Sequence, residues 1–129
     1  MKNDENKISF DIRGCAFKVQ NALGPGLLES VYETALSYEL TQLGYKVKNQ
    51  AGVPVNYDEI YFDVGFRADI LVNDSVIIEV KSVERIMDIN CNKLLTYLKL
   101  SGKKLGLLIN FNTVFLKDKE SLIRIVNNL

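Results

Sequence analysis

The spacing of apolar residues predicts two helices in the first third of the chain. Apolar side chains recur every three or four residues from Asn6 to Leu23, as on one face of an amphipathic helix. Gly24-Pro25-Gly26 is expected to end this helix as a turn. A second helix is expected from Leu27 to Leu43, before Gly44. Its predicted apolar stripe consists of Leu28, Val31, Tyr32, Ala35, Leu36, Leu40 and Leu43.

Beyond Gly44 the apolar period becomes two, which indicates strands. The expected strands cover residues 45–57 (with a break near Gly52), 61–72, 76–83, 105–111 and 122–126. A third helix is expected over 87–100. The segment 105–111 is almost wholly apolar, which is typical of a strand covered on both faces, whereas 122–126 alternates like an edge strand. This order predicts one α/β domain over residues 1–129, a three-layer α/β/α arrangement around a mixed sheet.

Composition narrows the chemistry that this domain can perform. The 129 residues include no histidine and only two cysteines. A structural zinc site and the Ser-His and Cys-His nucleophilic systems are therefore not expected. Any metal chemistry must use carboxylate and backbone oxygens, which suit Mg²⁺ or Mn²⁺. No run of 18 apolar residues and no apolar leader is present, so the prediction is a cytoplasmic protein without a membrane span.

Charge is balanced overall but uneven along the chain. Sixteen basic and sixteen acidic residues give a formal net charge of zero, which argues against strong non-specific adhesion to nucleic acid. Residues 1–80 carry seven Lys/Arg against twelve Asp/Glu, whereas residues 81–119 carry eight against three. A local basic surface is compatible with this distribution.

The expected strand 76–83 contains the chain's most unusual pattern. Glu79 and Lys81 interrupt β-branched residues and, being two apart, share one face of the strand. A three-residue loop from Asn73 to Ser75 pairs Val72 with Val76 and, by counting back, places Asp69 opposite Glu79. Their Cβ atoms would then lie within about 5 Å of each other. A two-residue loop without a bulge would instead put them on opposite faces.

Two adjacent carboxylates repel each other unless they share a proton or hold a cation. One interpretation is a cation site at Asp69 and Glu79. The other, equally supported by these residues alone, is a structural ion-pair cluster in which Arg67 and Lys81 neutralise the two acids.

Five segments resemble the GxxExxY protein family, in the expected order along the chain. They are Gly26-Leu27-Leu28-Glu29-Ser30-Val31-Tyr32, Phe66-Arg67-Ala68-Asp69, Glu79-Val80-Lys81, Tyr97-Leu98-Lys99-Leu100 and Gly106-Leu107-Leu108-Ile109-Asn110-Phe111. This family is similar to the PD-(D/E)XK nuclease superfamily. The resemblance implies a restriction-endonuclease-like αβββαβ core, with Asp69, Glu79 and Lys81 as the motif residues and Glu29 as the helix acid. Lys93 and Asn90 depart from the glutamine and histidine of the family pattern.

The resemblance also implies a function. Asp69, Glu79, the Val80 carbonyl and Glu29 would hold Mg²⁺ or Mn²⁺, and Lys81 would position or deprotonate a water that attacks a phosphodiester in DNA or RNA. The substrate-binding candidates are Arg67, Lys93, Tyr97, Tyr32 and Gln50.

Plainer interpretations stay open for most of these residues. Glu29 and Tyr32 have the spacing of a surface acid beside a core tyrosine, and Lys93 and Tyr97 that of a lysine extended over a half-buried ring. Arg67 and other basic residues are also compatible with a solvated face. The alternative function is a catalytically inactive nuclease-like module that binds nucleic acid or protein. A third is a homo-oligomer, such as a homodimer, that pairs through the edge strand 122–126.

Overall fold

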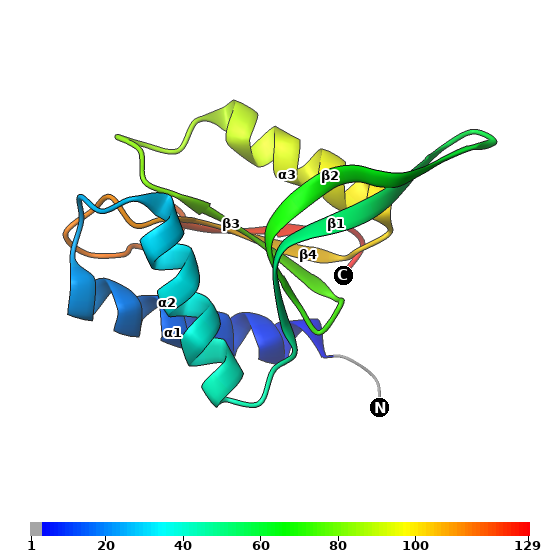
Figure 1. Ribbon diagram of the computed structural model, residues 1–129. Coiled ribbons are helices and arrows are strands. Elements are labelled where there is room, and N and C mark those ends of the chain that lie inside the picture. Colours follow the sequence, from blue (N-terminus) through cyan, green and yellow to red (C-terminus); the bar gives the residue numbers. More distant parts are fainter. Residues whose placement is uncertain (1–3) are drawn as a thin grey trace.

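The computed structural model describes residues 4–129, which form three helices and five strands (Figure 1). Their order is α1 (Glu5–Leu23), α2 (Glu29–Gln42), β1 (Val47–Tyr57), β2 (Ile60–Val72), β3 (Val76–Lys81), α3 (Asp88–Ser101), β4 (Leu105–Asn110) and β5 (Leu122–Val126). The run from α2 to β4 is the αβββαβ order that the sequence predicts. The predicted α/β class is confirmed.

The strands form one mixed sheet in the order β1-β2-β3-β4-β5. β1, β2 and β3 are antiparallel neighbours, and β3 pairs with β4 in parallel after the crossover through α3. β5 closes the other side as an antiparallel edge strand, as the alternation of 122–126 predicts. Val72 pairs with Val76 across the Asn73–Ser75 turn, so the predicted odd-numbered loop is confirmed.

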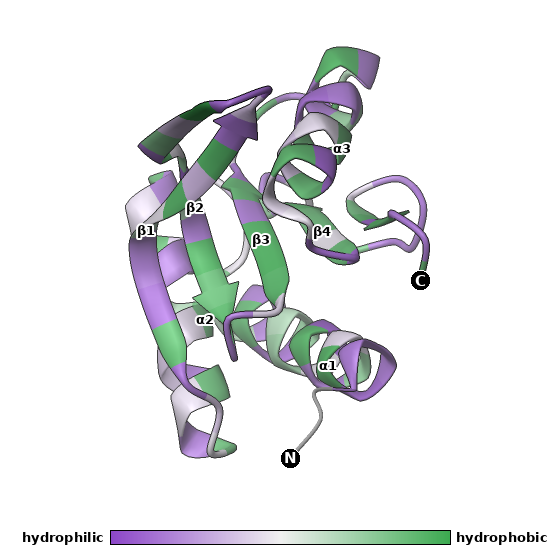
Figure 2. Cartoon of the chain, turned by 90° about the vertical axis from the view of Figure 1, so that its right-hand side faces the viewer, coloured by the Kyte–Doolittle hydropathy of each residue, from purple (hydrophilic) through white to green (hydrophobic). Residues whose placement is uncertain are grey.

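Helices cover both faces of the sheet, which gives the predicted three layers (Figures 1 and 2). α1 and α2 pack on one face over side chains such as Ile70, Ile78 and Leu107. α3 packs on the opposite face, where Leu94 and Leu98 lie over Leu71, Ile77 and Leu108. Every residue of β4 is buried, in agreement with the apolar run that predicts a strand covered on both sides. Within residues 4–129, the structure contains no helix with the length and apolar character needed to cross a bilayer.

The second helix differs from its predicted apolar stripe. It begins at Glu29 rather than Leu27, and three residues of the predicted stripe, Leu28, Val31 and Leu43, are exposed. The buried positions are Tyr32, Leu36, Ser37 and Leu40. Tyr32, Leu36 and Leu40 are four residues apart and, with Ser37 beside Leu36, form a narrower buried face than the predicted one.

β1 is irregular on both sides of Gly52, as the predicted break near this residue indicates: at Gln50, and between Val53 and Val55, where the register with β2 shifts. Gln50 has a φ of 48°, a left-handed conformation that is uncommon for a residue other than glycine. Asn49 points toward α2, where its amide donates to Ser37 Oγ at 2.7 Å, whereas Ala51 packs with the α3 core. The kink therefore changes which face of the sheet the later residues of β1 occupy, and it does so directly beside Asp69 of β2.

Candidate active site

The candidate site lies where the ladder between β2 and β3 ends. The last paired residues are Ile70 and Ile78, and the backbone N–H groups beyond them bind carboxylates. Val80 N–H donates to Asp69 Oδ2 at 2.8 Å, and Asp69 N–H donates to Glu79 Oε2 at 3.1 Å. The two acids thus replace the missing strand partners, because backbone donors that are partly removed from water need acceptors. These bonds hold Asp69 and Glu79 side by side, as the register predicts.

The pKa of Glu79 reflects its burial and the nearby charge of Asp69. Burial, and then the charge of Asp69, raise the pKa of Glu79 to about 7. The hydrogen bond from Asp69 N–H and the positive charges of Lys81 and Lys93 oppose this shift without cancelling it. A cation that contacts both Asp69 and Glu79 would stabilise the ionised form of Glu79, which burial and the charge of Asp69 disfavour.

Lys81 follows on the same strand face, and its side chain is half-buried. Among residues 4–129, neither it nor Arg67 forms an ion pair with Asp69 or Glu79. The structural ion-pair cluster, left open by the sequence, is therefore not what the structure shows. Lys81 stays available for a ligand near the acids.

The structure adds Glu33, which sequence reasoning missed. Gln50 Nε2 donates to Glu33 Oε1 at 2.9 Å and lies 3.3 Å from Asp69 Oδ1. Asn49 donates to the other oxygen, Glu33 Oε2, at 3.0 Å. Gln50 thus links α2 to Asp69, as its inclusion among the site candidates anticipates. The signal for Glu33 was its spacing, one helical turn after Glu29 on the same face of α2.

Glu29 binds the end of β3 and not the two acids. Its Oε2 accepts from Ser82 N–H at 3.2 Å, while Ser82 Oγ donates to the Leu27 carbonyl at 2.9 Å. Within the described part of the chain, no three Asp, Glu or Cys side chains form a group that could hold a metal ion. The structure therefore does not bring Glu29 to Asp69 and Glu79 as a third carboxylate. Its observed role is to join the start of α2 to the segment that follows Lys81.

Tyr32 is a core residue, which corrects its prediction as a substrate contact. Its side chain is fully buried and its ring stacks on Phe111 at 4.7 Å between centroids. The hydroxyl donates to the Gly24 carbonyl at 2.6 Å and accepts from Leu27 N–H at 3.1 Å. A buried ring between helix and sheet cannot touch a substrate, but its hydroxyl holds the turn that places Glu29.

We expect Tyr32→Phe to lower the free energy of unfolding by about 1–2 kcal/mol, since it leaves the Gly24 and Leu27 backbone groups without their partner. Urea denaturation followed by circular dichroism measures this change. Tyr38→Phe, on the exposed side of the same helix, is the matched control and should have little effect. Equal stability of Tyr32→Phe and the wild type would contradict the role given to the hydroxyl.

The two substrate-binding candidates on α3, Lys93 and Tyr97, are arranged as a lysine extended over a half-buried ring. Lys93 is exposed, with Nζ 5.8 Å from the centre of the Tyr97 ring. The other face of Tyr97 is occupied by Phe66, which stacks on it at 3.9 Å. Arg67 is exposed on β2. Lys93 and Arg67 are therefore open to solvent, whereas Tyr97 already packs against Phe66.

A cavity of about 790 Å³ lies beside this site but does not contain it. Its walls come from the segments 84–88 and 112–121 with Cys91, Asn110 and Ile123. Asp69, Glu79 and Lys81 are not among its lining residues. The acids therefore lie outside this cavity.

A family model for the PD-(D/E)XK nuclease superfamily matches residues 6–125. The chain belongs to the PD-(D/E)XK nuclease superfamily. This match spans α1 through most of β5 and thus includes every element that positions Asp69, Glu79 and Lys81. Neither the curated proteins nor the solved structures that were compared gave a match.

Members of the PD-(D/E)XK superfamily generally use divalent metal ions, and the donors here fit such an ion. Asp69 and Glu79 supply two carboxylates, and only oxygen donors are present, as Mg²⁺ and Mn²⁺ prefer. Val80 directs its N–H toward Asp69, so its carbonyl points to the same side of β3. Burial and then the charge of Asp69 raise the pKa of Glu79, and a cation beside both carboxylates would relieve the repulsion between them.

Proposed function

We propose that this chain is a divalent-metal-dependent nuclease that hydrolyses phosphodiester bonds in DNA or RNA. The observation that carries the proposal is the juxtaposition of Asp69 and Glu79 at the end of the β2–β3 ladder, with Lys81 next on the same face of β3. Membership of the nuclease superfamily supports the same reading.

Asp69, Glu79 and the Val80 carbonyl are the groups that would hold Mg²⁺ or Mn²⁺, with water completing the coordination. When bound, the ion would polarise a phosphoryl oxygen and make a bound water more acidic. The backbone donors of Val80 and Asp69 keep the two carboxylates in place, and Gln50 fixes Asp69 from the side of α2. The site is therefore organised by the fold before any substrate arrives.

Lys81 would hold the attacking water at Nζ and compensate the negative charge that develops on the phosphate. Lys93, whose positive charge acts on Glu79, and the exposed Arg67 of β2 are proposed as contacts for substrate phosphates. Glu33 and Glu29 are proposed as positioning residues, because they act on Gln50 and on Ser82 respectively.

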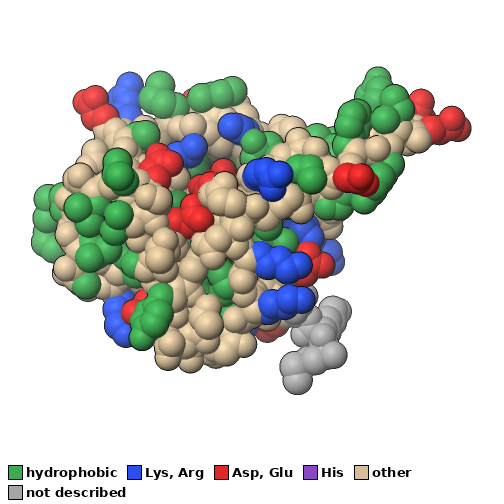
Figure 3. All heavy atoms as spheres, in the orientation of Figure 1, with side chains coloured by type: hydrophobic (Ala, Val, Ile, Leu, Met, Phe, Trp, Pro, Cys, Tyr) green, Lys and Arg blue, Asp and Glu red, His purple; other side chains and the backbone are tan. Residues whose placement is uncertain are grey.

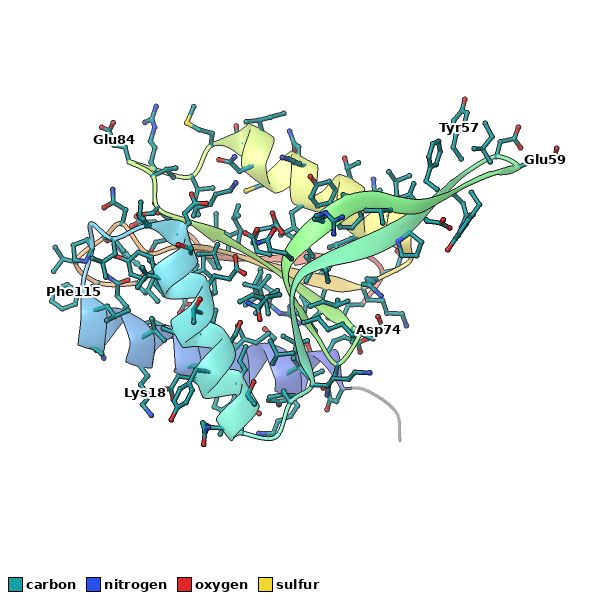
Figure 4. All side chains as sticks on the ribbon, in the orientation of Figure 1. Lys18, Tyr57, Glu59, Asp74, Glu84 and Phe115 are labelled. Carbon is teal, nitrogen blue, oxygen red and sulfur yellow. The ribbon has the colours of Figure 1, made fainter. Side chains whose placement is uncertain are left out.

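The test is cleavage of labelled single- and double-stranded DNA and RNA by purified protein with Mg²⁺, with Mn²⁺ and with EDTA. We expect cleavage only with the divalent ions, and a decrease of about 100-fold or more in Lys81→Ala. Lys18→Ala is the matched control. Lys18 lies on α1, away from α3 (Figure 4), and its side chain pairs with Glu39 of α2.

Cleavage that persists in EDTA, or that survives Lys81→Ala unchanged, would contradict the proposal. No cleavage of any substrate, together with no effect of Mg²⁺ or Mn²⁺ on thermal stability, would favour the non-catalytic module instead.

A further inference from the structure

Gln50 combines an unusual backbone conformation with a position directly beside the candidate site. Among residues 4–129, it is the only residue other than glycine that has a positive φ inside a strand, because the others lie in turns or after β5. Counting along the ladder between β1 and β2 places it opposite Asp69. A strained residue of β1 therefore faces one of the two acids.

Both strands change the face that they present at this point. Regular alternation would place residues 68 and 70 of β2 on the same face of the sheet. Instead Ile70 packs with α1 and α2, whereas Ala68 packs with α3. β1 changes face at Gln50 in the same way. The side chains of Gln50 and Asp69 consequently lie between α2 on one side and β3 on the other.

The amide group of Gln50 lies between two carboxylates. Its Nε2 atom donates to Glu33 Oε1 at 2.9 Å and to Asp69 Oδ1 at 3.3 Å. A terminal amide nitrogen carries two hydrogen atoms, so it can donate to both oxygens at once. It thereby occupies the place in which a cation would join the same two carboxylates.

This amide also keeps three acids from converging. Figure 3 shows acidic side chains on the face of the molecule between α2 and α3. Within the described residues, however, no three acidic side chains form a group that could hold a metal ion. The Gln50 amide separates Glu33 from Asp69, and backbone N–H groups bind Asp69 and Glu79. Asp69 and Glu79 are the pair that remains for an ion.

A structural link between α2 and the sheet does not require the contact of Gln50 with Asp69. Asn49 already joins the two elements, since its amide donates to Glu33 Oε2 at 3.0 Å and to Ser37 Oγ at 2.7 Å. A glycine at position 50 would adopt the left-handed backbone without strain. Neither the backbone of β1 nor the attachment of α2 therefore explains why a glutamine amide reaches Asp69.

We propose that Gln50 limits the site to a single divalent ion, because its amide occupies the position between Glu33 and Asp69 that a second ion would need. This inference rests on the proposed function and deepens it. Two-ion nucleases hold their ions about 4 Å apart and use them to stabilise both the attacking and the leaving oxygen. With a single ion, more of the negative charge that develops on the phosphate is left to Lys81.

Binding of Mn²⁺ to the full chain, in the absence of substrate, tests the proposal. Titration calorimetry should give one ion per wild-type chain and two per chain of Gln50→Gly, in which glycine keeps the backbone conformation and removes the amide. The second ion should bind at least about tenfold more tightly to the variant than to the wild type, because it no longer displaces two hydrogen bonds. Electron paramagnetic resonance should show spin coupling between two Mn²⁺ ions in the variant alone.

The matched control is Asn49→Ala, which removes the neighbouring amide from Glu33 and leaves Gln50 in place. It should bind one ion, as the wild type does. Gln50→Gly/Glu33→Gln should lose the second ion again, because one of the two carboxylates that hold it is gone.

Gln50→Asn makes the same test with a different side chain. Asparagine also tolerates a left-handed backbone, but its amide is one methylene group shorter and should not span the two acids. This variant should therefore bind two ions as well. Circular dichroism of each variant establishes that it is folded.

Three results would overturn the proposal. The first is a wild type that binds two ions as tightly as Gln50→Gly does. The second is that Gln50→Gly and Gln50→Asn, both folded, bind no more ions than the wild type. The third is a second ion that persists in Gln50→Gly/Glu33→Gln, since that ion would lie elsewhere.

Failure of the proposed function would give a different result. A wild type that binds no ion would contradict the metal site at Asp69 and Glu79. The role of Gln50 would still be decided by the difference in the number of bound ions between Gln50→Gly and the wild type.

Discussion

Asp69→Asn should reduce metal-dependent cleavage roughly a thousandfold, the equivalent of about 4 kcal/mol of lost transition-state stabilisation. The asparagine retains a carbonyl oxygen that can accept from Val80 N–H, so the end of the β2–β3 ladder should remain in place. What the change removes is one of the two negative charges that would hold the ion. Initial rates at saturating Mn²⁺, with thermal melting of the same samples, measure the two effects separately.

The control for this variant is Asp74→Asn, which alters an exposed aspartate in the turn between the same two strands. Its activity should match that of the wild type. Cleavage by Asp69→Asn at near the wild-type rate would remove Asp69 from the site and, with it, the central element of the proposed function.

Between pH 4 and pH 8, the free energy of unfolding of Glu79→Gln should rise relative to that of the wild type by up to about 3 kcal/mol. The folded state raises the pKa of Glu79 from 4.5 to about 7, through burial and then the charge of Asp69. Between these two values the unfolded chain has lost its proton and the folded chain has kept it. Stability of the wild type therefore falls as the pH rises from about 4.5 to about 7 and levels off above that.

Urea denaturation of both proteins from pH 4 to pH 8 measures this difference. The comparison with Glu79→Gln isolates one group, because Asp11 and Asp118 have lowered pKa values and change the stability of both proteins alike. Glu84→Gln, at an exposed glutamate after β3 (Figure 4), should show no comparable dependence on pH. If the difference in stability between the two proteins stayed constant from pH 4 to pH 8, Glu79 would have the same pKa in the folded and the unfolded state.

Metal binding connects the two predictions. If Asp69 and Glu79 hold a divalent ion, Mn²⁺ should stabilise the wild type more at pH 8 than at pH 5, since the ion competes with the proton on Glu79. Both Asp69→Asn and Glu79→Gln should lose this stabilisation. The same gain in all three proteins would place any metal ion elsewhere.

The sequence by itself determined the element order, the three layers and the pair Asp69–Glu79. Period-two and helical spacing are local properties, so they located all eight elements within a few residues. The Asn73–Ser75 turn is also local, and its odd length placed the two acids together by register. The buried strand 105–110 could be recognised because burial on both faces leaves a run of apolar positions with a polar residue, Asn110, only at its end.

Only the tertiary structure decided what contacts each side chain of the site. Glu29 reaches Ser82, and Glu33 reaches Gln50, because α2 crosses the sheet at an angle that helical spacing does not specify. Tyr32 is core because Phe111, far away in the sequence, covers its ring. The left-handed conformation of Gln50 likewise accompanies contacts with distant segments, through Glu33 and Asp69. Period and spacing describe one element at a time, whereas a site is made where several elements meet.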